Sequence, residues 1–86
     1  MIGEKEIAEI LRTKKVVYGY KESIKMIKNG KGELIIIAEN TPEEKKKEIE
    51  YNAKISGIKL EIFPGSSKKL GLLCGRPHPI TVLVVE

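Results

Sequence analysis

This 86-residue chain has few of the residues that build covalently or metal-stabilised folds. Its single cysteine, Cys74, cannot form an internal disulfide, and its single histidine, His78, leaves no Cys/His cluster with metal-ligand spacing. No apolar run approaches the roughly eighteen residues of a membrane span. Residues 1–6 mix acidic and basic side chains and do not resemble a signal or transit peptide. We therefore expect a cytoplasmic, reduced protein with no metal, no cofactor and no membrane partner.

Catalytic motifs are also missing. The sequence contains no P-loop, no Gly-x-Gly-x-x-Gly motif and no nucleophile elbow. His78 lies between two prolines, and the spacing of the sequence offers it no triad partner, since aspartate is absent from the chain altogether. The glutamates lie mostly among lysines, which is typical of a solvated, charge-paired surface. We expect no enzymatic activity.

Hydrophobic periodicity predicts alternating helices and strands in one domain, residues 1–86. Apolar residues recur at helical spacing in some segments and form short β-branched or continuous runs in others. The predicted helices cover residues 7–11, 22–28, 42–56 and 67–74, and the predicted strands cover residues 16–18, 34–38, 58–62 and 80–85. This order indicates an α/β fold with a central sheet and helices on both faces. The two most apolar runs, 34–38 and 80–85, are expected to be interior strands of a sheet that is either parallel or mixed.

The clearest local signal is the sequence Asn-Thr-Pro-Glu-Glu at residues 40–44. Thr41 is predicted to cap the third helix, Pro42 to take its first position and Glu44 to complete a capping box, with Asn40 as a competing cap. The last helix has two candidate caps, Ser66 and Ser67.

Most aromatic side chains are assigned to the core. Tyr18, Tyr51 and Phe63 are expected to pack internally rather than to stack on bases, and Cys74 is expected to be a small buried residue. For Tyr20, which follows a glycine at a helix entry, both roles stay open.

The positive charge is unevenly distributed along the chain. The net charge is +4 at pH 7, and residues 12–31 contain seven basic side chains and one acid, Glu22. Lys21, Lys25 and Lys28 share one face of the predicted second helix, whose start after a glycine favours an anion. A second basic segment, residues 68–76, contains no acid, whereas residues 33–61 are slightly acidic. This pattern suits a phosphate backbone, although a merely solubilising face is the alternative.

Three stretches of the chain carry a family resemblance. They are Gly-Tyr-Lys-Glu-Ser-Ile-Lys at residues 19–25, Leu-Ile-Ile-Ile-Ala-Glu-Asn-Thr-Pro at 34–42, and Leu-Gly-x-x-x-Gly-Arg-Pro-His at 70–78. With Gly-Lys at 30–31 and Ile-Glu-Tyr at 49–51, they resemble the archaeal and eukaryotic L30e family of large-subunit ribosomal proteins, part of the L7Ae superfamily. The resemblance implies a three-layer α/β/α sandwich with a central four-stranded mixed sheet that binds kink-turn RNA.

The same resemblance implies an RNA-binding surface built from three loops. The first meets the kink and its sheared G·A pairs, the second contacts a base near the kink, and the third packs on an extruded nucleotide. Together with the basic helix face, the expected RNA-binding residues are Gly19, Tyr20, Lys21, Glu22, Lys25, Lys28, Glu39, Asn40, Gly75, Arg76, Pro77 and His78. Other members of the superfamily usually have Asn-Glu where this chain has Lys21-Glu22.

These observations favour a non-catalytic structural constituent of the large ribosomal subunit that binds a kink-turn in ribosomal RNA. Neighbouring ribosomal proteins are further expected partners, and we expect the free chain to be monomeric. Two alternatives stay open: a kink-turn protein of a non-ribosomal RNA particle or mRNA leader, and a protein-interaction module with an incidental basic face. Residues 45–47, three lysines on the mixed-charge third helix, are expected not to contact RNA.

Overall fold

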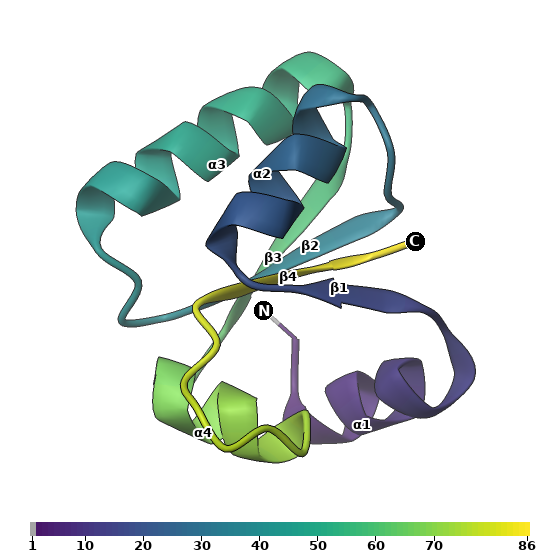
Figure 1. Cartoon of the computed structure of the whole chain (residues 1–86), viewed down its shortest axis with the longest axis vertical. Coiled ribbons are helices and arrows are strands. Elements are labelled where there is room, and N and C mark those ends of the chain that lie inside the picture. The colour runs from purple at the N-terminus through teal and green to yellow at the C-terminus, as the bar shows by residue number, and fades with distance from the viewer. Residues whose placement is uncertain (1) are drawn as a thin grey trace.

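The computed structural model describes residues 2–86 as four helices and four strands that alternate along the chain (Figure 1). Their bounds are α1 Glu4–Thr13, β1 Val16–Tyr18, α2 Tyr20–Lys28, β2 Leu34–Ala38, α3 Glu43–Ser56, β3 Lys59–Phe63, α4 Ser67–Leu73 and β4 Val82–Val85. The predicted order of elements is confirmed. The last strand begins two residues later than predicted, because Ile80 is buried while it still belongs to the preceding loop.

The four strands form one mixed sheet in the order β1-β4-β2-β3. Strands β2 and β3 are parallel, and β4 is antiparallel to both of its neighbours, β1 and β2. The two interior strands are therefore β2 and β4, as their continuous apolar sequences predict. Every residue of β4 is buried, and so are the last four residues of β2.

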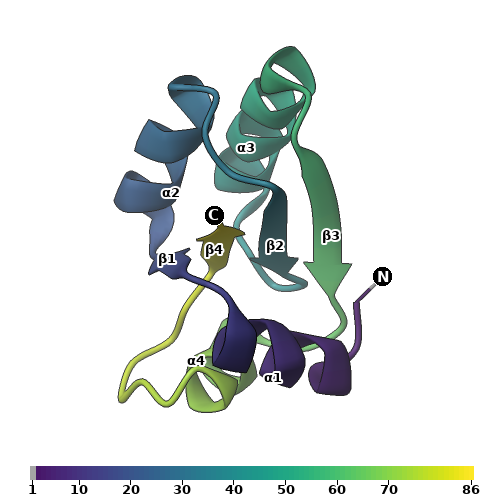
Figure 2. The ribbon, with the colours of Figure 1, turned by 90° about the vertical axis from the view of Figure 1, so that its right-hand side faces the viewer.

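Two helices cover each face of the sheet, which makes a three-layer sandwich (Figure 2). Because side chains alternate along a strand, Ile36 and Leu83 point to the α1 and α4 side, whereas Ile37 and Val84 point to the α2 and α3 side. Each layer thus has its own apolar core, anchored by Phe63 on the first side and by residues of α2 and α3 on the second. The α/β/α sandwich implied by the family resemblance is confirmed.

The predicted capping box at α3 is wrong. The helix begins at Glu43 with Pro42 as its N-cap, and no side chain caps it. Thr41 instead turns inward, where its buried hydroxyl lies 2.7 Å from the carbonyl oxygen of Ala38 and 3.1 Å from that of Thr81. A buried hydroxyl needs an acceptor for its proton, and these carbonyl oxygens at the end of the sheet provide one, which outweighs a local capping bond at an exposed helix start.

The prediction that Tyr51 packs in the core is also wrong. Tyr51 and Ile55 are each 67% exposed on α3, while Ile49 and Ala53 of the same helix are buried against the sheet. Residues two apart on a helix are separated by about 200° around its axis. Tyr51 therefore cannot share the inward face that Ile49 defines.

The sheet topology gathers four connections at one end of the molecule. Strands β1, β2 and β3 all finish at this end, and the antiparallel β4 starts there. The backbone N–H of Gly19 donates to Val82 at 3.0 Å, and that of Ala38 donates to Thr81 at 2.8 Å. We call this region the loop end and define it as residues 18–20, 39–42, 64–66 and 74–81. It contains most of the residues that the sequence selects for RNA.

Candidate RNA-binding surface

The junction between β1 and α2 presents an uncapped helix start. Gly19 is the N-cap, with φ of 93°, a conformation that glycine adopts without strain. Its carbonyl oxygen accepts from the backbone N–H of Ser23 at 3.0 Å. Since glycine has no side chain, no side chain in residues 2–86 caps the N–H groups of the first turn, which carry the positive end of the helix dipole.

Tyr20 is tied to α3 by two contacts. Its hydroxyl donates to Oε2 of Glu48 at 2.5 Å, and the ammonium of Lys45 lies 5.1 Å from the centre of its ring. The sequence assigned Lys45 to the lysines that do not contact RNA, but the structure places its charge beside Tyr20 at the edge of the loop end. Lys45 is therefore unsuitable as a control for RNA binding. This contact joins residues 25 positions apart, so periodicity gives no sign of it.

The Tyr20 hydroxyl is expected to ionise unusually late. Its hydrogen bond to the Glu48 carboxylate, assisted by burial and by the negative charge of Glu48, raises the pKa of Tyr20 to about 12. The pKa in the folded protein exceeds the usual value of 10.0. The hydrogen bond therefore makes its full contribution to stability below pH 10, and that contribution is lost as the pH rises through about 12. Ultraviolet titration of tyrosinate should show one late step. Glu48→Gln should move that step toward 10, and Tyr20→Phe should remove it; an unchanged step in Glu48→Gln would contradict the assignment.

Asn40 connects two loops of the surface. Its Oδ1 accepts from the backbone N–H of Ser67 at 2.8 Å, so Asn40 covers the start of α4. Ser66 is the N-cap of that helix and accepts from Lys69 at 3.2 Å, which confirms one of the two predicted caps. The Asn40 side chain thus caps a helix, but a different one from the helix that it precedes in sequence. Its amide nitrogen and the neighbouring Glu39 side chain stay at the exposed surface.

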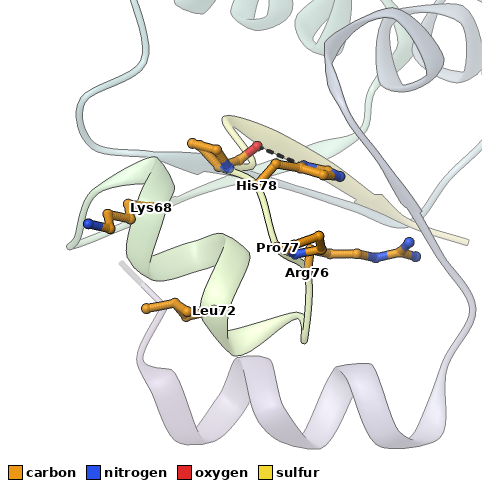
Figure 3. Close-up of a pocket in the computed structure, with 6 residues that line it drawn as sticks. Lys68, Leu72, Arg76, Pro77 and His78 are labelled. Carbon is orange, nitrogen blue, oxygen red and sulfur yellow. Dashed lines mark hydrogen bonds between the residues drawn. The ribbon is translucent and has the colours of Figure 1, made fainter.

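The loop between α4 and β4 is held close to α4 by backbone contacts. Gly75 ends the helix with φ of 70°, and the N–H of Arg76 donates to Gly71 at 2.9 Å. Beside it lies a shallow, mostly apolar pocket of about 170 Å³ (Figure 3). The pocket is lined by Lys68, Leu72, Arg76, Pro77, His78 and Pro79. His78 is exposed, with Nδ1 at 3.3 Å from the carbonyl oxygen of Pro79.

Arg76 stacks on Tyr18. The guanidinium carbon lies 4.3 Å from the centre of the Tyr18 ring, which is within the range of a cation–π contact. Tyr18 is half-buried and also packs against the core under α1 and α4. The core assignment of Tyr18 is therefore correct only in part. The sequence offers no signal for the second contact, because the two residues lie 58 positions apart.

The basic face of α2 is exposed as predicted. Lys21, Lys25 and Lys28 point to solvent, and none of them forms an ion pair with an acid in residues 2–86. Lys21 and Glu22 lie in the first turn, beside the loop end. Lys28 follows Tyr20 by eight residues, about 12 Å along the helix axis, so it lies at the opposite end of α2. The structure thus gathers the selected residues at or near one end except Lys25 and Lys28, which lie in the last turn of α2.

No group of three or more His, Cys or Glu side chains in residues 2–86 is placed to hold a metal ion. Burial raises the pKa of the Cys74 thiol, which keeps it protonated and poorly nucleophilic. Among the helices described, none is both long and apolar enough to cross a membrane.

Comparison with known proteins extends the family resemblance over the whole chain. The model of the ribosomal protein L7Ae/L30e/S12e/Gadd45 family matches residues 1–86. The large ribosomal subunit protein eL30 of Aeropyrum pernix is 39% identical over 85 residues, 99% of this chain and 85% of the relative. The eL30 protein of Sulfurisphaera tokodaii is 44% identical over 82 residues, 95% of this chain and 77% of the relative.

The match reaches eukaryotes, and the fold occurs in bacteria too. The eL30 protein of Tetrahymena thermophila is 37% identical over 82 residues, 95% of this chain and 79% of the relative. A solved structure of a Bacillus halodurans protein of unknown function has a TM-score of 0.79 at 20% identity, covering 92% of this chain and 78% of that one, which supports the fold alone. The chain belongs to the ribosomal protein L7Ae/L30e/S12e/Gadd45 family, in its non-catalytic eL30 branch of large-subunit ribosomal proteins.

Proposed function

We propose that this chain is a structural constituent of the large ribosomal subunit that binds a kink-turn in ribosomal RNA through its loop end. The observation that carries the proposal is the convergence of three segments, residues 19–22, 39–40 and 75–78, at one end of the sheet. They are distant in sequence, and the resemblance selected them for RNA. A surface composed of several loops on a rigid sheet can contact both arms of a bent RNA at once.

The first two segments supply groups for the phosphate backbone and for base edges. A kinked RNA brings phosphates together, and the open N–H groups of α2 with Lys21 and Lys25 offset that repulsion. The Glu22 carboxylate accepts hydrogen bonds from exocyclic amino groups of bases. Asn40 has given its oxygen to Ser67, so its amide nitrogen is left to donate to a base acceptor.

The third segment offers a stiff apolar contact. Pro77 and Pro79 restrict the backbone on both sides of His78, and the close packing on α4 fixes its position. A loop that is already ordered loses little entropy on binding. It can therefore hold the ring of His78 and the side of Pro77 against an unstacked nucleotide, which is how single-stranded RNA is commonly recognised.

The proposal predicts that the free protein bends a kink-turn RNA. Energy transfer between dyes on the two RNA arms should rise on adding protein at moderate salt and low magnesium, whereas a straight duplex of equal length should show no change. The affinity should fall steeply with salt, because phosphate contacts release counterions. Folded protein that leaves the RNA straight would disprove the proposal, and binding insensitive to salt would favour a protein-interaction module. Equal affinity for kink-turns of non-ribosomal RNAs would extend the target to other RNA particles.

A further inference from the structure

Two tyrosines flank the glycine at the centre of the loop end, and each carries a cation from a different segment. Tyr18, the last residue of β1, has the Arg76 guanidinium over its ring at 4.3 Å. Tyr20, the first residue of α2, has the Lys45 ammonium over its ring at 5.1 Å. The left-handed conformation of Gly19 separates the two rings, since Tyr18 packs under α1 and α4 while Tyr20 packs toward α3.

Both cations keep their hydrogen-bond donors available. The side chains of Arg76 and Lys45 have no hydrogen-bond or ion-pair partner among residues 2–86, whereas those of other basic residues, such as Lys14 and Lys69, pair with glutamates. A guanidinium that stacks by its face leaves its N–H edges open, and those edges match the two oxygens of a phosphate. In Figure 3 the Arg76 side chain points away from Lys68 and Leu72.

We infer that Arg76 and Lys45 are paired phosphate-binding residues, and that Tyr18 and Tyr20 are the positioning residues that hold them. The inference rests on the proposed function and adds Lys45, Tyr18 and a defined role for Arg76 to it. Long cationic side chains lose rotamer freedom when they bind a phosphate. A side chain that already stacks on a ring is partly ordered, so it loses less entropy on binding. Because α3 and the α4–β4 loop approach Gly19 from opposite faces of the sheet, the two cations contact phosphates on separate stretches of the kinked strand.

The cations can be tested by the salt dependence of binding. Arg76→Ala and Lys45→Ala should each lower the slope of log affinity against log salt by about one. Lys47→Ala is the matched control, because Lys47 lies two residues from Lys45 on α3 and thus on the opposite side of that helix. Arg76→Lys should keep the slope and lose affinity, since lysine replaces the charge but not the two parallel donors. A slope unchanged by Lys45→Ala, or equally changed by Lys47→Ala, would overturn the inference.

The tyrosines can be tested by a double-mutant cycle. Tyr18→Leu keeps an apolar side chain but removes the ring, and it should weaken RNA binding by about threefold. The same change should have no effect in an Arg76→Ala background, whereas Tyr18→Phe should bind like the wild type. A merely structural tyrosine would instead cause the same loss in both backgrounds. Melting temperatures recorded for each variant separate loss of folding from loss of positioning.

A measurement on the free protein keeps this inference separate from the proposed function. The Nε–H proton of Arg76 should be shifted upfield by the Tyr18 ring current in NMR spectra, and Tyr18→Leu should abolish that shift. Salt slopes measured on a straight RNA duplex test the two cations without any kink. If the protein fails to prefer kinked RNA, the proposed function fails while these measurements still decide the stacking. If the ring-current shift is absent from the wild-type protein, the inference fails whatever the RNA does.

Discussion

Replacing Gly71 by alanine should lower the free energy of unfolding by about 2 kcal/mol. Gly71 is buried in α4, and a Cβ at this position would lie 2.3 Å from the carbonyl oxygen of His78 and 3.3 Å from Cα of Pro79. Both obstacles are backbone atoms, so no side-chain rotation relieves the clash. The α4–β4 loop must move away from the helix, which also displaces His78 and Arg76 from the loop end. Urea unfolding measures the stability, and titration with kink-turn RNA measures the second effect.

Gly57→Ala provides the matched control for that prediction. Unlike Gly71, Gly57 adopts a left-handed conformation, with φ of 71°, and an added Cβ there meets nothing within 4 Å. The expected cost is about 1 kcal/mol, from backbone strain alone. Gly57 follows α3 at the end of the molecule away from the loop end, so RNA affinity should not change. If Gly71→Ala is as mild as Gly57→Ala and leaves binding intact, the close approach of the loop to α4 does not position this surface.

The double variant Lys21→Ala/Lys25→Ala should bind kink-turn RNA on the order of thirtyfold more weakly at about 0.15 M salt. Each lysine that contacts a phosphate adds about one to the slope of log affinity against log salt, so the slope should fall by about two. Both side chains are exposed and lack an ion-pair partner in residues 2–86, so no internal contact compensates for their loss. Filter binding or fluorescence anisotropy over a series of salt concentrations measures both quantities.

The effect of each lysine is expected to depend on its position along α2. Lys28→Ala should have a smaller effect than either Lys21→Ala or Lys25→Ala, because it lies about 12 Å from the helix start. Lys31, in the loop after α2, is exposed at the far end of the sheet and serves as the control for loss of net charge. Equal losses for all four lysines would mean that diffuse attraction, rather than contact at the loop end, governs binding.

Local sequence patterns were sufficient to predict the order of the elements and the central sheet with helices on both faces, but they left open whether the sheet is parallel or mixed. The continuous apolar runs that became β2 and β4 can only be buried on both faces, and the helices between strands require layers on both sides of the sheet. Amphipathic spacing is a property of a few neighbouring residues, so it predicts a helix or a strand without knowledge of the rest of the chain. The capping box failed for the opposite reason. Thr41 had a local role available, but buried carbonyl oxygens from β2 and from the start of β4 offered a better one.

Some features of the candidate surface followed from the sequence, and others could be known only from the tertiary structure. The sequence by itself selected the loops that we propose bind RNA, through the family resemblance and the acid-poor basic segments. Only the tertiary structure decided how they are arranged: Asn40 caps α4, Arg76 stacks on Tyr18, Lys45 lies over Tyr20, and Lys25 and Lys28 lie in the last turn of α2, away from the loop end. These contacts join residues that are 25 to 58 positions apart, so the periodicity of the sequence does not reveal them. They depend on the order and direction of the strands, which bring distant loops to one end of the sheet.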